Sequence, residues 1–158
     1  MSQSSVQILV ESLEKKNRLM DDIILENEAQ EAILKQEELD MDALDASIER
    51  MGALAEALEK LDDGFELVYE RTREALIANK PAYRSQIAHM QELIGQITDK
   101  VVRINAVRMR NQIKAERQFQ KSRNQIGKAA SKMKASKNYY NSMNKLNYVA
   151  PQFYDNKK

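Results

Sequence analysis

Apolar residues recur at alternating intervals of three and four along most of this chain, a spacing that predicts long amphipathic α-helices. The first such stripe covers about residues 4–35, and Ser4 or Ser5 is its expected N-cap. Its apolar members are Val6, Leu9, Val10, Leu13, Met20, Ile23, Ile24 and Leu34. Three positions within the stripe are polar, namely Asn17, Asn27 and Glu31. Because the stripe is wide, it predicts a helix in a bundle, whose polar residues set its register against neighbouring helices.

A second stripe follows the polar link of residues 36–40, and Asp40 or Asp42 is the expected N-cap of its helix. Its members are Leu44, Ile48, Met51, Ala55, Leu58, Phe65, Tyr69, Thr72 and Leu76. The stripe keeps its phase across Asp62-Asp63-Gly64, although two aspartates and a glycine favour a break. We therefore expect a kink or a short interruption at residues 62–64, within one continuous domain.

Pro81 marks the clearest boundary, because it disfavours helix at Lys80 and fits the first turn of a new helix. The third stripe consists of Tyr83, Ile87, Met90, Ile94, Ile97, Val101 and Ile104. Further along, the apolar residues thin to Met109, Ile113, Phe119, Ile126 and Met133. Helix-favouring residues nevertheless continue to about Lys137. The third helix is therefore expected to outlast a core that we place between residues 6 and 107, and to project from it.

The predicted fold is all-α. The first two helices, and residues 81–115 of the third, would each be about 50 Å long at 1.5 Å per residue. Short connections make neighbouring helices antiparallel. The sequence thus predicts one domain over residues 1–137, an up-down-up three-helix bundle or coiled coil whose third helix projects.

Residues 138–158 differ from the rest of the chain, because they are rich in asparagine and lack a helical period. They hold five of the nine aromatic residues, namely Tyr139, Tyr140, Tyr148, Phe153 and Tyr154. We interpret this segment as a flexible tail whose aromatic side chains dock onto another protein. The alternative is a tail that folds back onto its own bundle.

The net charge of +1 hides two halves of opposite sign. Residues 1–78 contain 20 acidic and 8 basic residues, whereas residues 79–158 contain 4 acidic and 17 basic residues. If the halves pack side by side, most of this charge is mutually neutralised; otherwise the second half is a basic rod that attracts an anionic partner. A nucleic-acid-binding protein is therefore one alternative function, although no aromatic residues interleave the basic ones before Tyr139.

The residue inventory argues against an enzyme, a cofactor or a metal centre. There is no cysteine, the four glycines stand far apart, and His89 is the only histidine. His89 and Glu92 have the spacing of half a carboxylate metal site, but a second histidine is missing, so we expect an ordinary boundary residue. No apolar run is long enough for a transmembrane helix, and the N-terminus lacks a secretory signal pattern. A cytoplasmic location is the expectation.

The junction between the first two predicted helices has the sequence EAILKQEELDMDALDASIERMGALAEALEKL, residues 31–61. This stretch resembles FlgN-type flagellar export chaperones, and the likeness covers roughly residues 6–137. The resemblance implies a cytosolic chaperone that holds hook–filament junction proteins and delivers them to the flagellar type III export gate. In that family a C-terminal tyrosine takes part in docking at the gate, and Tyr139 and Tyr140 match it. The other tail aromatics extend beyond the shorter family pattern.

A chaperone of this kind needs an apolar surface that covers the amphipathic helices of its clients. The sparse series on the third helix is the candidate client-binding site, and its methionines can adapt to varied partners. These residues are Met109, Ile113, Phe119, Ile126 and Met133. One alternative is that they pack against the ends of the first two helices. A homodimeric coiled-coil scaffold is a further alternative for the whole chain.

Overall fold

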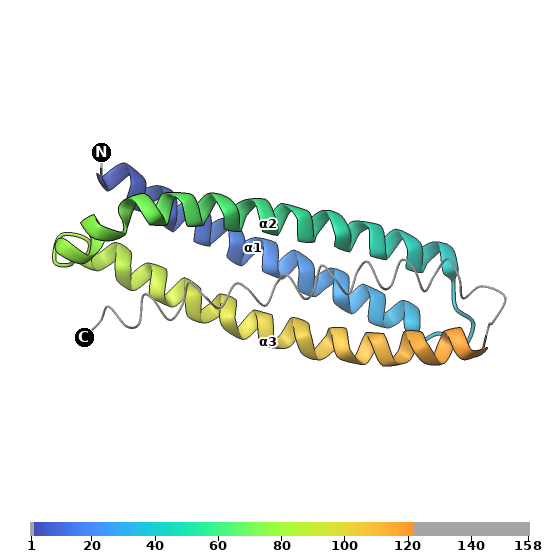
Figure 1. Ribbon diagram of the computed structural model, residues 1–158. Coiled ribbons are helices and arrows are strands. Elements are labelled where there is room, and N and C mark those ends of the chain that lie inside the picture. The colour runs from blue at the N-terminus through green and yellow to red at the C-terminus, as the bar shows by residue number, and fades with distance from the viewer. Residues whose placement is uncertain (1, 122–158) are drawn as a thin grey trace.

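The computed structural model describes residues 2–121, which form three helices that pack along one another (Figure 1). They are α1 (Ser2–Leu34), α2 (Met41–Ala78) and α3 (Arg84–Lys121). Within this part of the chain there is no strand, so the predicted all-α class with three helices is confirmed. None of the three helices is long and apolar enough to cross a membrane.

α1 lies between the other two helices and packs along both of them. Partners on α1 and α3 rise together in residue number, so these helices run parallel, whereas partners on α1 and α2 rise in opposite order. The α1–α3 pairs are Glu14 with His89, Glu28 with Arg103 and Glu31 with Arg110. The α1–α2 pairs are Lys16 with Asp62 and Glu26 with Arg50.

The helix boundaries follow local hydrogen bonding. Asp40 is the N-cap of α2, because its Oδ1 accepts a hydrogen bond of 3.1 Å from the backbone N–H of Ala43. After α2, the backbone N–H of Ala82 donates to the carbonyl of Asn79 at 2.9 Å and forms a turn. Pro81 lies in this turn, and α3 begins only at Arg84. The expectation that Pro81 starts the third helix was therefore wrong by three residues.

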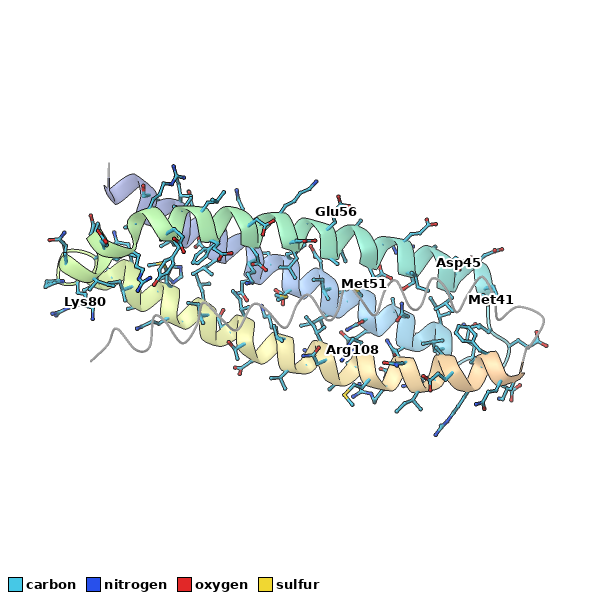
Figure 2. The ribbon with its side chains drawn as sticks, in the orientation of Figure 1. Met41, Asp45, Met51, Glu56, Lys80 and Arg108 are labelled. Atoms are coloured by element: carbon cyan, nitrogen blue, oxygen red, sulfur yellow. The ribbon has the colours of Figure 1, made fainter. Side chains whose placement is uncertain are left out.

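The predicted stripes form the core. Every member of the α1 and α2 series is buried, and in the third series only Ile87 is half-buried. Figure 2 shows the resulting division on α2, where Met51 points into the bundle and Glu56 points away from it. A second, smaller core cluster lies where α1 ends and α2 begins. Its buried members are Leu34, Leu44, Ile48 and Ala115.

The expected interruption at residues 62–64 is absent, because α2 is continuous from Met41 to Ala78. The sequence stripe skips Asp62, which occupies the heptad position between Leu58 and Phe65. In the structure that position faces α1, and Asp62 forms an ion pair with Lys16. The apolar contacts on both sides and this ion pair outweigh the low helix propensity of Asp62 and Gly64, which is only about 1 kcal/mol per residue.

The expectation that α3 projects beyond residue 107 was wrong for the described part of the helix. Asn111, Ala115 and Gln118 are buried against α1 and its C-terminal end. They continue the heptad spacing from Ile104 at intervals of seven, four and three. The core was missed here because small and polar residues occupy the seam in place of large apolar ones. The residues from 122 to Lys137, also expected to be helical, lie outside the described residues.

Candidate functional site

α3 carries a row of exposed apolar side chains on the face opposite its buried seam. Val102, Met109 and Ile113 are 65%, 58% and 50% exposed, and Ala106 between them is also exposed. Their spacing of four, three and four residues places all four on one face of the helix. We call these four residues the α3 outer stripe. A contiguous exposed apolar row of this kind is a feature of interaction surfaces rather than of an ordinary solvated helix face.

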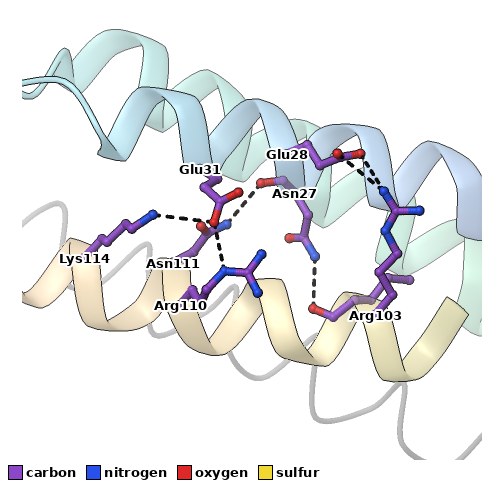
Figure 3. Close-up of polar contacts among 8 residues, drawn as sticks. Asn27, Glu28, Glu31, Arg103, Arg110, Asn111 and Lys114 are labelled. Atoms are coloured by element: carbon purple, nitrogen blue, oxygen red, sulfur yellow. Dashed lines mark hydrogen bonds and ion pairs between the residues drawn. The ribbon is translucent and has the colours of Figure 1, made fainter.

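Buried polar side chains on α1 and α3 fix the rotation of α3, and with it the direction of the outer stripe. Asn27 Nδ2 donates to the Ile104 carbonyl at 3.2 Å, and Asn111 Nδ2 donates to the Asn27 carbonyl at 3.1 Å (Figure 3). These two hydrogen bonds join α1 to α3 at Ile104 and Asn111, which lie about two turns apart along α3. A rotated or shifted α3 would leave buried donors without acceptors, so one register is favoured.

Ion pairs flank the outer stripe on the side that faces α1. Arg110 Nε lies 3.0 Å from Glu31 Oε2, and Lys114 Nζ lies 3.5 Å from the same oxygen (Figure 3). The hydrogen bond from Arg110, together with the positive charge around it, lowers the pKa of the Glu31 carboxyl. Arg103 contacts Glu28 at 3.5 Å in the same way. Acidic α1 therefore neutralises much of basic α3, as expected if the two halves of the chain pack side by side.

The structure divides the predicted client-binding residues into three groups. Met109 and Ile113 lie together on the outer stripe. Phe119 does not join them, because it is half-buried against the smaller core cluster at the end of α1. Ile126 and Met133 lie outside the described residues, as do the predicted docking residues. Those docking residues are Tyr139, Tyr140, Tyr148, Phe153 and Tyr154.

Sequence reasoning missed two members of the outer stripe, Val102 and Ala106. The signal was present, because residues 102, 106, 109 and 113 repeat the four-three spacing on a second face of the same helix. The series predicted from the sequence joins Met109 and Ile113 to Phe119 instead, and Phe119 lies toward the core side. The buried seam of α3 continues through Asn111 and Gln118, and its phase separates the two faces of the helix.

The outer stripe consists of apolar side chains only. No group of three or more acidic or histidine side chains that could hold a metal ion exists among residues 2–121. His89 is exposed and lies 3.3 Å from Glu14 of α1. An exposed apolar face on a rigid helix can pack against one face of another amphipathic helix.

Comparison with known proteins provides no relative from which a role could be transferred. No family model matches the sequence. No similar protein is found among the curated proteins or among the solved structures.

Proposed function

We propose that this protein is a cytoplasmic flagellar export chaperone of the FlgN type, without catalytic activity or cofactor. In this proposal it binds hook–filament junction proteins and delivers them to the flagellar type III export gate. The resemblance of residues 31–61 suggests the family, and the α3 outer stripe is the observation that supports the binding role. The working unit is an up-down-up bundle over residues 1–137, followed by a docking tail over residues 138–158.

The outer stripe has suitable dimensions for a client helix. Val102 and Ile113 are eleven residues apart, which corresponds to about 16 Å along the axis of α3. An amphipathic client helix of about three turns would cover this length with apolar residues at the same four-three spacing. Met109, near the middle of the stripe, has a flexible side chain that adjusts to clients of different shape.

The residues that we propose to contact the client therefore differ from the series predicted from the sequence. Val102, Ala106, Met109 and Ile113 form the proposed contact, and Phe119 is assigned to packing within the bundle. Ile126 and Met133 remain proposed client contacts on sequence grounds alone. Tyr139 and Tyr140 remain the first proposed contacts with the export gate, followed by Tyr148, Phe153 and Tyr154.

The ion pairs between α1 and α3 weigh against nucleic acid as the partner. Lys100 contacts Asp21 at 2.8 Å, and three further cations of α3 are engaged by Glu28 and Glu31. A phosphate backbone would have to compete with these carboxylates for the same cations, and affinity would fall steeply with salt. We therefore favour a protein client.

The test is a binding measurement between the full chain and terminal helical segments of hook–filament junction proteins, by isothermal titration calorimetry. The double variant Met109→Ser/Ile113→Ser should bind at least tenfold more weakly and keep its helical circular dichroism. The matched control is Leu25→Ser/Leu67→Ser, because these residues are 65% and 66% exposed on α1 and α2.

Two results would overturn the proposal. One is a Met109→Ser/Ile113→Ser variant that binds the segments as tightly as the unchanged protein. The other is an unchanged protein that binds none of them but forms dimers that this variant dissociates, as shown by light scattering. The second result would assign the outer stripe to a homodimeric coiled coil.

A further inference from the structure

A cavity of about 270 Å³ lies between the end of α2 and the start of α3. Figure 2 labels Lys80, one of its lining residues, at the turn that joins the two helices. Its apolar lining is formed by Tyr69, Leu76, Ile77, Pro81, Ile87 and Ala88. This volume is near the lower end of the range for small-molecule pockets, and a largely apolar lining is typical of them. The size favours a small ligand.

Three cations line the same cavity. Arg73 lies on α2, Lys80 lies in the turn that follows it, and Arg84 begins α3 on the opposite wall. No carboxylate belongs to the described lining. Within residues 2–121 none of the three cations forms an ion pair, whereas four cations farther along α3 each pair with a carboxylate of α1. The cavity therefore combines an apolar interior with positive charge that no described acidic residue neutralises.

Gln91 provides an independent indication of a ligand. Gln91 lines the cavity from α3, and it lies on the same face of that helix as Arg84 and Ala88. Its Nε2 is buried and donates no hydrogen bond to any acceptor of the described chain. A buried donor without an acceptor is costly, and an oxygen atom of a bound ligand would remove that cost.

We propose that this cavity binds a small amphipathic carboxylate, such as a medium-chain alkyl carboxylate. The alkyl chain packs against Leu76 and Ile87, the carboxylate is attracted by Arg73, Lys80 and Arg84, and Gln91 donates to a ligand oxygen. The three cations favour an anionic ligand over a neutral or cationic one, and the limited volume leaves room for only one alkyl chain. This site is separate from the outer stripe, because Gln91 and Val102 are eleven residues apart, about 16 Å along α3. The inference therefore stands whether or not the proposed chaperone function does.

The test uses the full chain and three probes that share one alkyl chain: octanoate, octan-1-ol and octylammonium, each below its aggregation concentration. Isothermal titration calorimetry at pH 7 should show saturable octanoate binding, at least tenfold tighter than binding of octylammonium, with octanol in between. The variant Arg73→Gln/Arg84→Gln should weaken octanoate binding at least tenfold. The control Arg18→Gln/Arg117→Gln removes two exposed arginines elsewhere and should leave it within twofold.

A second variant tests the interior of the cavity. Ala88 is exposed on α3 and lines the cavity, so Ala88→Leu should fill space and abolish octanoate binding while the thermal midpoint stays within a few degrees. If Ala88→Leu fails to fold, the arginine variants still decide the question. Absence of saturable octanoate binding, or equal binding of octanoate and octylammonium, would overturn the proposal. So would an Arg73→Gln/Arg84→Gln variant whose only change is a lower mass in solution, which would assign the cavity to a second copy of the chain.

Discussion

Lys16 of α1 and Asp62 of α2 form an ion pair across the helix interface, with Lys16 Nζ 2.7 Å from Asp62 Oδ1. The two side chains are unequally buried, because Lys16 is 7% exposed and Asp62 is 29% exposed. Burial lowers the pKa of Lys16 and raises the pKa of Asp62, while their mutual attraction opposes both shifts. Asp62 therefore compensates the buried charge of Lys16, and the pair does not add a large net stabilisation to the fold.

The unequal burial predicts unequal effects of removing each partner. Asp62→Leu leaves the Lys16 ammonium buried without its carboxylate, so we expect the free energy of unfolding to fall by about 3 kcal/mol. Lys16→Met leaves a carboxylate that still reaches water, and its cost should be about 1 kcal/mol. The double variant Lys16→Met/Asp62→Leu should be at least as stable as the unchanged protein. Urea unfolding at pH 7 measures all three.

The relative free energies of unfolding of these three variants test the prediction of unequal effects. Equal losses for both single variants would mean that Lys16 reaches water as easily as Asp62 does. A double variant less stable than the unchanged protein would mean that the pair contributes net stabilisation, contrary to the expectation for a buried pair. Lys60→Met is a suitable control, because Lys60 lies 3.7 Å from Glu56 in an exposed pair on α2, and its loss should cost less than about 0.5 kcal/mol.

Asp62 also illustrates why the course of α2 could be predicted only in part. The apolar members of its stripe, from Leu44 to Leu76, are all buried, because residues three and four apart share one helix face. The local sequence at residues 62–64 favours a break, and nothing local indicates that Lys16 faces Asp62. That contact depends on the register of α1 against α2. A prediction that considers each helix alone therefore finds the apolar stripe of α2 but not the Lys16–Asp62 ion pair that fills its missing position.

The environment of Glu31 predicts loss of stability in acid. Because Arg110 and neighbouring cations lower the pKa of Glu31 in the folded state, the unfolded chain binds its proton more readily. The contribution of Glu31 is therefore complete above the unfolded pKa of about 4.5, and it is lost as the pH falls through the lower folded value. Relative to Glu31→Gln, the unchanged protein should be more stable at pH 7 and lose this advantage below about pH 4.

Thermal unfolding of both proteins between pH 3 and 8 measures this difference, with Glu56→Gln as the control. Glu56 has a side chain that is 63% exposed and lies beside Lys60 rather than between helices. Its substitution should change the thermal midpoint less than Glu31→Gln does at pH 7. A constant offset between the unchanged protein and Glu31→Gln at every pH would contradict the assignment of this carboxylate to the α1–α3 ion pairs.

The two faces of α3 should respond very differently to truncation. Ile97 is 5% exposed in the middle of the core, so Ile97→Ala should lower the free energy of unfolding by about 2–5 kcal/mol. Ile94 is buried equally and should behave alike. Val102→Ala is the matched control on the outer stripe, where it should cost less than about 0.5 kcal/mol. A large loss for Val102→Ala in denaturant unfolding would show that the stripe is covered in the isolated protein.

The candidate site was predictable to the extent that its residues are large and apolar. Met109 and Ile113 stood out in the sequence and are exposed in the structure. Ala106 did not stand out, because an alanine marks a helix face only once its neighbours on that face are known. Phe119 was assigned to the wrong face because the seam beneath it consists of Ala115 and Gln118, which do not resemble a core. Which face of a helix is buried is thus hardest to predict from the sequence where that face consists of small and polar residues.

Gln118 joins the distal part of α3 to the end of α1. Its Nε2 donates to the Leu34 carbonyl at 3.2 Å and to the Gln36 carbonyl at 2.7 Å. Carbonyls at a helix C-terminus have no partner within the helix, and this side chain supplies one. Gln118→Met keeps the length of the side chain and removes both hydrogen bonds. The free energy of unfolding should therefore fall by about 1–2 kcal/mol, although methionine is the more apolar residue.

Hydrogen exchange should locate this effect at the end of α1, with faster exchange at Leu34 and the residues that follow it. The control is Gln120→Met, because Gln120 is exposed two residues farther along the same helix and its substitution should leave both measurements unchanged. If α3 instead projected from the bundle at this point, Gln118→Met and Gln120→Met would have the same small effect. That outcome would restore the prediction of a projecting third helix, and it would remove the packing role of Phe119 as well.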